Sequence, residues 1–262
     1  MSGSVAFAPA DGDGVARVLL ANPGKLNAID IAMWRELKRG FDALQALPAA
    51  EAPRAVIVAG AGGQFASGGD IVEFATFRFD EGRLHDFHEQ VVAPALQAML
   101  ACDVPLFAQI DGACIGGGFE IAACCDIRVG GASSRFGAPI AKLGFPMAPG
   151  ELELLARVAS PAVLREMLLE ARLFDATRAL QLGLVHAVVP DSEVGAQTLQ
   201  RARHAAALSP QAARINKRTL RQLAAGGPTA PERRAHFDYA ASEEHREGVT
   251  AFIEKRPARF RP

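Results

Sequence analysis

The sequence predicts an α/β fold in which helices cover a parallel β-sheet. Three short apolar runs, at 55–59, 105–110 and 127–130, have the character of fully buried strands. Helical patterns separate these runs, and parallel strands need crossovers of this kind. The chain has 262 residues, of which 50% are hydrophobic, so it is long enough to bury a substantial core.

A β-hairpin and a helix are expected before the first of these strands. Residues 5–8 and 15–21 have strand character on either side of the turn sequence Asp-Gly-Asp-Gly at 11–14. Asn27 is expected to cap the helix that follows. Apolar side chains then recur at helical spacing, at Met33, Leu37, Phe41 and Leu44. The strand at 55–59 completes a strand-helix-strand unit.

The alternation continues and then gives way to helices. One helix is expected at 84–100 and another from the glycine run at 116–118. After Pro161, four helical patterns and one short apolar run follow, at 161–170, 175–182, 192–207 and 210–225 and at 184–189. The sequence Gly-Gly-Pro at 226–228 is a candidate hinge before a terminal helix at 243–255. The C-terminal third is therefore mainly helical.

Two glycine-rich turns follow neighbouring strands and indicate where the reaction takes place. The sequence Gln-Phe-Ala-Ser-Gly-Gly-Asp-Ile at 64–71 comes after the strand at 55–59, and the triple glycine at 116–118 ends the next strand region. Ligands of open α/β sheets bind at such neighbouring strand ends. One backbone N–H from each turn is expected to converge on a carbonyl oxygen and to stabilise an enolate. Glu120 is the candidate for proton transfer.

Structural explanations of these residues remain open. Glycines between a strand and a helix often serve only a tight turn, and Glu120 could instead cap a helix or pair with Arg128. Nucleotide binding and a serine-hydrolase mechanism lack support. Ile121 stands where the dinucleotide fingerprint requires glycine, and neither Gly-Lys-Ser/Thr nor Gly-x-Ser-x-Gly occurs.

Composition excludes several classes of protein. The formal charge is -1 without long blocks of one sign, so nucleic acid or an anionic membrane surface is not an expected partner. The first 14 residues lack the basic start and apolar core of a signal peptide, and no apolar run approaches spanning length, so a cytoplasmic location is expected. His85 and His88 share helical spacing without a third ligand, so solvated helix surface rather than a metal site is expected. The cysteines are expected to be reduced and buried, at Cys102, Cys114, Cys124 and Cys125.

Both glycine turns resemble the hallmark segments of the crotonase, or enoyl-CoA hydratase/isomerase, superfamily. The segments are Phe-Ala-Ser-Gly-Gly-Asp at 65–70 and Asp-Gly-Ala-Cys-Ile-Gly-Gly-Gly-Phe-Glu at 111–120. Further segments resemble the family in the same order along nearly the whole chain, at 18–28, 126–129, 179–186 and 247–256. The resemblance implies a crotonase-like spiral of ββα units, assigned to residues 1–195. It also implies a helical C-terminal trimerisation region, assigned to residues 196–262, and hence a homotrimer or a hexamer made of two trimers.

The resemblance also implies which residues carry the reaction. The N–H groups of Gly69 and Gly117 would form an oxyanion hole for a thioester carbonyl, and Glu120 falls on the first catalytic glutamate of the family. Standard hydratases place a second glutamate directly after the proline at 139, where this chain has Ile140. Glu151 and Glu153, slightly downstream, are expected on a helix surface and not in catalysis.

The binding of coenzyme A is implied in the same way. Lys25 and Leu26 would border the coenzyme A, and the backbone of Ala66 would contact the adenine. Phe252 and Lys255 would reach the nucleotide end, often that of a neighbouring subunit. Coenzyme A belongs to the acyl-CoA substrate, so neither a separate cofactor nor a metal is expected.

Taken together, these residues predict an acyl-CoA enzyme, most directly a hydro-lyase that adds water to a 2-enoyl-CoA. Because Ile140 replaces an acid/base group, enoyl-CoA isomerase, acyl-CoA decarboxylase and non-catalytic binding of CoA thioesters remain open. The sequence Leu-Gly-Phe-Pro-Met at 143–147 resembles a segment of methylmalonyl-CoA decarboxylase. That relative has tyrosine where Met147 stands, which weakens the decarboxylase alternative.

Overall fold

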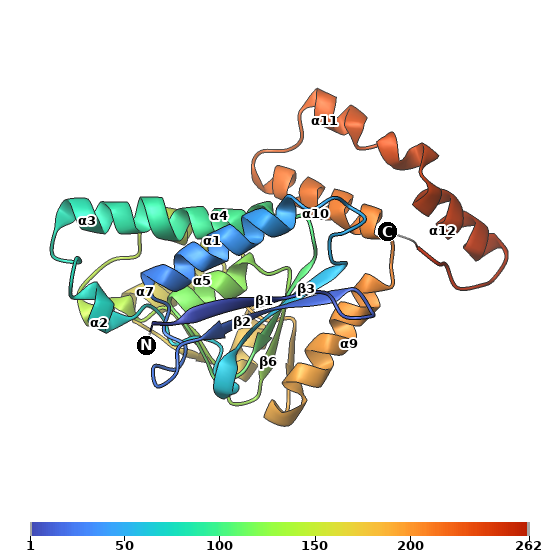
Figure 1. The fold of residues 1–262 in the computed structure, drawn as a ribbon. Coiled ribbons are helices and arrows are strands. Elements are labelled where there is room, and N and C mark those ends of the chain that lie inside the picture. Colours follow the sequence, from blue (N-terminus) through green and yellow to red (C-terminus); the bar gives the residue numbers. More distant parts are fainter. Residues whose placement is uncertain (1, 261–262) are drawn as a thin grey trace.

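A parallel sheet forms the centre of the computed structural model, which describes residues 2–260 (Figure 1). Its six strands lie in the order β1 (Ser4–Ala8), β2 (Val15–Ala21), β3 (Ala55–Gly60), β4 (Leu106–Ile110), β6 (Ile127–Gly131) and β9 (Ala187–Val189). β1 and β2 pair antiparallel, and the other neighbours pair parallel. Both the expected hairpin and the expected parallel sheet are confirmed.

A second, smaller sheet stands beside the first at the glycine turns. Its three strands are β5 (Ala113–Ile115), β7 (Arg135–Gly137) and β8 (Phe174–Asp175). β5 follows β4 after a turn at Gly112, whose φ is 56°. The chain thus leaves the main sheet before the triple glycine, which follows directly after β5.

Helices cover both faces of the main sheet. The helices before residue 190 are α1 (Ile31–Gln45), α2 (Ile71–Phe74), α3 (Glu81–Asp86), α4 (Ala93–Ala101), α5 (Gly117–Cys124), α6 (Pro149–Leu155), α7 (Pro161–Leu169) and α8 (Ala176–Gln181). α1, α4 and α5 bury their apolar side chains in the larger core on one face. On the other face, Ala202 and Ala206 of α9 (Val194–Ala206) pack against Ile57 and Phe107.

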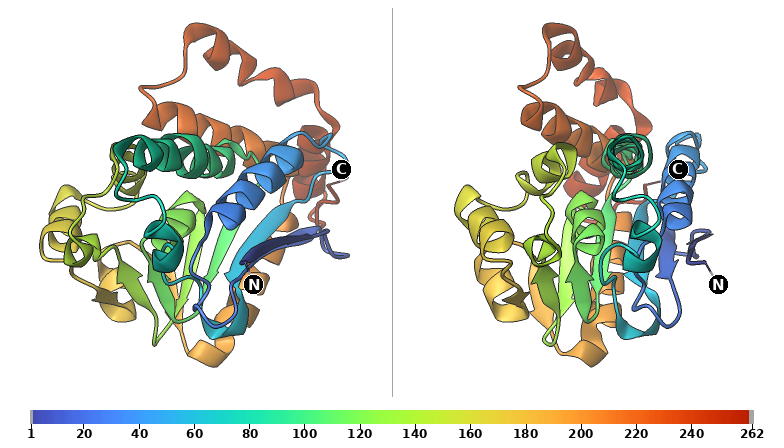
Figure 2. Two further views of the ribbon diagram at one scale, coloured as in Figure 1. Left: turned by 60° about the vertical axis from the view of Figure 1, so that its left-hand side comes forward. Right: turned by 90° about the vertical axis from the view of Figure 1, so that its left-hand side faces the viewer.

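Of the C-terminal helices, the first is held to this body by salt bridges from Lys217, Arg218 and Arg221 to Asp126 and Asp103, and the next two extend away from it (Figures 1 and 2). They are α10 (Pro210–Ala224), α11 (Ala230–Ala235) and α12 (Glu243–Ile253). The expected helical C-terminal third is confirmed, whereas the domain boundary at residue 195 stays a prediction. None of the helices in the described part of the chain combines the length and the apolar character needed to cross a bilayer.

The first helix starts later than Asn27, the residue expected to cap it. Asp30 caps α1, because its carboxylate accepts a hydrogen bond from the N–H of Met33. Asn27 adopts a left-handed conformation with φ 56°, and its side-chain amide donates to the carbonyls of Ala61 and Gln64. Asn27 therefore fastens the turn before α2.

The helical region expected at 84–100 spans residues 81–101 and is interrupted. Asp80 caps α3, and residues 87–92 between α3 and α4 form a π-helical stretch. Phe87 and Val92, the two buried residues of that stretch, also line the cavity described below. Short 3₁₀ segments occur elsewhere, at 61–63, 140–143, 191–193 and 238–241.

All four cysteines are free and buried, as expected. Burial raises the pKa of the Cys114 and Cys124 thiols well above the ordinary value. The neutral thiol is therefore the form that these sites favour. Cys114 and Cys124 contribute to the larger core as small apolar side chains.

Buried Arg128 fixes the end of α5 to β6 and to the segment before β9. Its Nε donates to the carbonyl of Leu184 at 2.7 Å, and its Nη1 donates to those of Cys125 and Ala122 at 2.5 and 3.5 Å. The guanidinium thus donates its hydrogen bonds to backbone carbonyls, and the alternative that it pairs with Glu120 is wrong.

Replacing Arg128 by methionine is expected to lower the free energy of unfolding by about 2–4 kcal/mol, because buried carbonyls lose their donors. Urea unfolding of the variant measures this loss. Arg135→Met is the matched control, since Arg135 is exposed and its guanidinium donates to the nearby carbonyls of Ser133 and Ser134. Equal stability of the two variants would show that the Arg128 contacts contribute nothing.

Candidate active site

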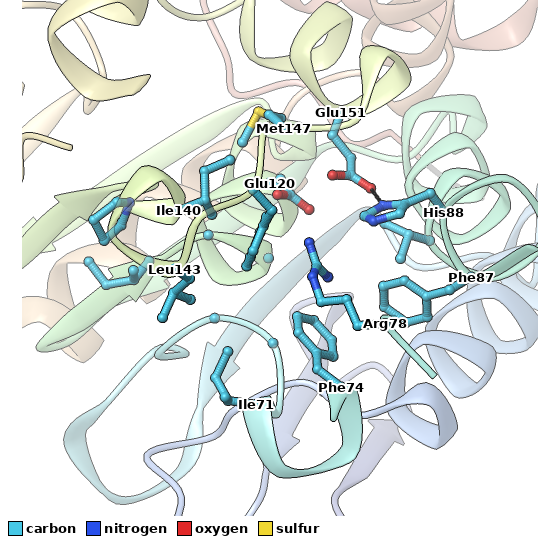
Figure 3. A pocket seen from close by; sticks show the side chains of 18 of the residues that line it. Ile71, Phe74, Arg78, Phe87, His88, Glu120, Ile140, Leu143, Met147 and Glu151 are labelled. Carbon is cyan, nitrogen blue, oxygen red and sulfur yellow. Dashed lines mark hydrogen bonds and ion pairs between the residues drawn. The ribbon is translucent and has the colours of Figure 1, made fainter. Parts of the chain in front are cut away.

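A cavity of about 280 Å³ opens between the two glycine turns, the segment from α2 to α4 and the segment 139–151 (Figure 3). Most of its wall is apolar, and it includes Trp34, Ile71, Phe74, Phe87, Val92, Ile140, Leu143 and Met147. Five ionisable side chains also line it: Arg78, His88, Glu120, Lys142 and Glu151. A few polar groups in an apolar hollow are typical of a ligand site.

The two glycine turns lie side by side, as the sequence predicted. Ala66 and Cys114 form a parallel β-bridge, in which the N–H of Ile115 donates to the carbonyl of Ala66 at 3.0 Å. A Cβ atom on Gly118 would lie 2.5 Å from that same carbonyl oxygen, so this close approach requires glycine. Gly116 has φ 49° and ψ −120°, a conformation that only glycine adopts readily.

Each turn presents one backbone donor at the cavity wall. Ile29 forms hydrogen bonds with both neighbours of Gly69. Its N–H donates to the carbonyl of Gly68, and its carbonyl accepts from the N–H of Asp70. Gly117 opens α5, where N–H groups have no acceptor inside the helix. Within residues 2–260, neither Gly69 nor Gly117 has an acceptor for its N–H. The site thus offers two backbone N–H groups that have no acceptor among the described residues. Their convergence on one oxygen stays a prediction.

Glu120 lies in the first turn of α5 with only 6% of its surface exposed. Burial raises the pKa of its carboxyl group well above the ordinary value, and the charge of Glu151 raises it further. A Cβ atom on Gly117 would lie 3.9 Å from one oxygen of this carboxyl group. The acid that the sequence predicted therefore stands beside one of the two free donors, and its neutral form is favoured.

A second glutamate reaches the cavity, and the expectation that it lies on a helix surface is wrong. Glu151 is 6% exposed, and its Oε1 lies 2.5 Å from Nδ1 of His88 (Figure 3). The sequence held a signal for this placement. Glu151, Leu154 and Leu155 have the i, i+3, i+4 spacing of one helix face, and all three are buried. Glu153 is exposed, as expected.

His88 also departs from the expected helix surface. Its side chain is 17% exposed, against 69% for His85, so the two histidines do not act as a pair. The ring of Phe87 packs edge-on against that of His88 at 5.1 Å between centroids. Among residues 2–260, no group of three or more His, Cys, Asp or Glu side chains is arranged to hold a metal ion.

Arg78, a residue that the sequence reasoning missed, points into the same cavity (Figure 3). Its guanidinium carbon lies 3.4 Å from the ring centroid of Phe145 and 4.7 Å from that of Phe74. Burial lowers the pKa of Arg78, while the charge of Glu151 opposes the shift. The sequence Phe-Arg-Phe-Asp at 77–80 gave no helical or strand periodicity that would have placed this side chain inside.

Comparisons with known proteins identify the family. The model of the enoyl-CoA hydratase/isomerase family matches residues 10–262. The chain belongs to this family. Its crotonase fold is also that of solved structures. An enoyl-CoA hydratase/carnithine racemase from Magnetospirillum magneticum has a TM-score of 0.92 and 35% identity, over 98% of this chain and 96% of that one.

Other members of the enoyl-CoA hydratase/isomerase family agree. A probable enoyl-CoA hydratase from Rhizobium meliloti (strain 1021) is 31% identical over 250 residues, which are 94% of each chain. The structure of a putative family protein from Hyphomonas neptunium has a TM-score of 0.89 and 31% identity, over 99% of this chain and 97% of that one. These similarities establish the family and the fold.

The residues expected to bind coenzyme A lie at two separate places in this family member. Lys25 forms a salt bridge of 2.5 Å with Asp70, and Leu26 is exposed. Ala66 is fully buried, and the bridge to Cys114 uses both its N–H and its carbonyl. Its contact with adenine stays a prediction.

The other two expected residues belong to the C-terminal region. Phe252 lies in α12 and is 86% exposed, and Lys255 follows shortly after that helix. α12 lies far from α2 and α3, which flank the cavity (Figure 1). A single chain thus does not bring Phe252 and Lys255 to its own cavity, and their role at a neighbouring subunit stays a prediction.

Proposed function

We propose that this protein adds water across the double bond of a 2-enoyl-CoA and forms a 3-hydroxyacyl-CoA. The observation that carries the proposal is that Glu120 and Glu151 line one cavity together with Gly69 and Gly117. A hydratase needs one group that takes a proton from water and one that gives a proton to the α-carbon. Glu151 supplies the second carboxyl group that Ile140 cannot.

The two carboxyl groups have different surroundings, which suggests their roles. The N–H groups of Gly69 and Gly117 hold the thioester oxygen and stabilise the enolate that forms when water attacks the β-carbon. Glu151, held by His88, takes the proton of that water. Glu120, whose neutral form burial favours, gives its proton to the α-carbon. A proton passed from Glu151 to Glu120 restores the starting state.

The reaction needs no group beyond the coenzyme A that the substrate carries. The proposal includes assembly as a homotrimer, or as a hexamer of two trimers, in which Phe252 and Lys255 of one chain reach the coenzyme A of the next. The exposure of Phe252 and Ile253, at 86% and 72%, is consistent with side chains that another chain covers.

The proposal is tested by following the absorbance of the conjugated enoyl thioester and by identifying the product. Loss of absorbance with formation of a 3-hydroxyacyl-CoA is expected. Conversion of a 3-enoyl-CoA to the conjugated thioester without hydration would instead establish an isomerase. Calorimetric binding of acyl-CoA, with no turnover of enoyl, 3-hydroxyacyl or malonyl thioesters, would establish a binding protein.

Replacing Glu151 by glutamine is expected to lower kcat about a hundredfold, because the water loses its proton acceptor. Glu153→Gln is the matched control, since Glu153 lies in the same helix and is exposed. The absorbance assay compares both variants with the unchanged protein. Equal activity of Glu151→Gln and Glu153→Gln would remove Glu151 from the mechanism.

A further inference from the structure

Arg78 and Lys142 are the charged side chains of the cavity lining that the proposed reaction leaves unused, and Arg78 is the less exposed of the two. One of its terminal nitrogens, Nη1, is buried and has no hydrogen-bond partner among the described residues. A buried N–H of a charged group that lacks a partner costs about 1–3 kcal/mol or more. An arginine kept in this state beside a ligand cavity is suited to a partner that arrives with the ligand.

The guanidinium group is held in place by aromatic rings instead of carboxylates. It lies over Phe145 at 3.4 Å, and Phe74 approaches it at 4.7 Å. Its Nη1 accordingly forms no hydrogen bond with Glu120 or Glu151, and Glu151 is paired with His88. Stacking fixes the plane of the guanidinium and leaves its edge free to donate.

The charges around the cavity favour an anionic partner. Glu120 is favoured in its neutral form, Glu151 is paired with His88, and Lys142 is exposed. Arg78 is half-buried, and its Nη1 is a buried donor that has no partner among the described residues. A carboxylate matches the planar, two-pronged donor edge of a guanidinium better than any neutral oxygen does.

Arg78 can meet the far end of a short acyl chain whose thioester lies at Gly69 and Gly117, because all three residues line the same cavity. In Figure 3, Arg78, Phe87 and His88 lie on one side of Glu120, whereas Ile140 and Leu143 lie on the other. With a volume of about 280 Å³, the cavity is at the small end of ligand pockets, which suits a short chain. The phosphates of coenzyme A are separated from the thioester by the long pantetheine arm, so a thioester held at Gly69 and Gly117 leaves them outside so small a cavity.

We propose that the cavity takes an acyl-CoA whose acyl chain ends in a carboxylate, and that Arg78 binds this carboxylate. The inference rests on the proposed function, since it names the class of 2-enoyl-CoA that is hydrated: the monothioester of an unsaturated dicarboxylic acid. Arg78 determines specificity in this account and takes no part in proton transfer.

Calorimetry with saturated thioesters tests the inference without requiring turnover. Two ligands are compared: glutaryl-CoA, and its isostere in which an isopropyl group replaces the terminal carboxylate. The unchanged protein is expected to bind glutaryl-CoA about tenfold to a hundredfold more tightly, as a charge-assisted bidentate pair allows. Arg78→Met is expected to reduce this ratio to about one. Arg78→Lys keeps the charge but loses the planar, two-pronged donor edge of the guanidinium, so it is expected to retain part of the preference for glutaryl-CoA.

Arg83→Met is the matched control, because Arg83 is exposed in the neighbouring helix α3. It is expected to keep the full ratio. Tighter binding of the isostere by the unchanged protein would overturn the inference. So would an equal loss of affinity for both thioesters and for free coenzyme A in Arg78→Met, since that result assigns Arg78 to the phosphates or to the fold. A preserved preference for glutaryl-CoA in a protein that hydrates nothing would support the inference and reject the proposed function.

Discussion

Replacing Glu120 by glutamine is expected to lower kcat for hydration by about 10²–10⁴-fold. Glutamine keeps the size of the side chain and its place in the first turn of α5, but it cannot give a proton to the α-carbon. The loss falls on kcat, because binding of the thioester depends on backbone donors and on the apolar wall. The absorbance assay measures it at saturating substrate. Full activity of the variant would exclude the acid role of Glu120.

The pH dependence provides an independent measure of the same group. Burial raises the pKa of Glu120, so the protonated donor persists above the ordinary range of glutamate. The step that uses this donor slows as the pH rises through the raised pKa. A rate limited by this step is therefore expected to fall on the alkaline side, and Glu120→Gln is expected to lose that limb.

Glu120→Gln is expected to lower activity but to raise the free energy of unfolding at alkaline pH, which separates lost chemistry from lost folding. In the folded protein Glu120 binds its proton more tightly than in the unfolded chain, so its contribution to stability is complete below the unfolded pKa. It declines as the pH rises towards the folded pKa. Glutamine never ionises, so the free energy of unfolding of Glu120→Gln is expected to exceed that of the unchanged protein increasingly as pH rises. Urea unfolding over this range checks the sign.

The parts of the molecule that the sequence predicted well depend on local backbone demands. Gly116 and Gly118 are fixed by a left-handed conformation and by the approach of the Ala66 carbonyl, and both requirements appear directly as glycine. Buried parallel strands such as β3 appear as continuous apolar runs, because both faces of the sheet are covered. Glu120 was predicted as the group for proton transfer because it lies close to the glycine run in the sequence.

The parts that were missed depend on which distant segments meet. Glu151 comes 31 positions after Glu120, and His88 and Arg78 come from the region between α2 and α4. No local periodicity states that these segments close over one cavity. Glu151 had a usable signal, since it shares a helix face with Leu154 and Leu155, but a charged residue at such a position is ordinarily assigned to solvent.

The start of α1 also depends on a contact between distant segments. Asn27 and Asp30 are both good capping residues, and the sequence does not distinguish them. The structure selects Asp30 because it also accepts a hydrogen bond from the N–H of Gly3, 27 positions away, at 2.7 Å. Asn27 is needed instead at the turn before α2. Competition between distant partners decided the outcome.

Removing the donor of Gly117 is expected to produce the other large loss. Gly117→Pro deletes the N–H at the first position of a helix, where proline is otherwise tolerated. Loss of one oxyanion donor lowers kcat by about 10²–10³-fold. The change alters the stabilisation of the enolate, so it is expected to affect kcat more than the binding of a saturated acyl-CoA.

Gly117→Ala is the matched control, because it keeps the donor and introduces the same Cβ atom. That atom would lie 2.9 Å from Cζ2 of Trp34, so the indole ring must shift in both variants. Proline additionally restricts Gly116, and urea unfolding of both variants measures that cost. If proline and alanine variants of similar stability hydrate the substrate equally fast, the N–H of Gly117 does not hold the thioester oxygen. If only the proline variant loses kcat, the donor itself carries the effect, since packing against Trp34 is common to both.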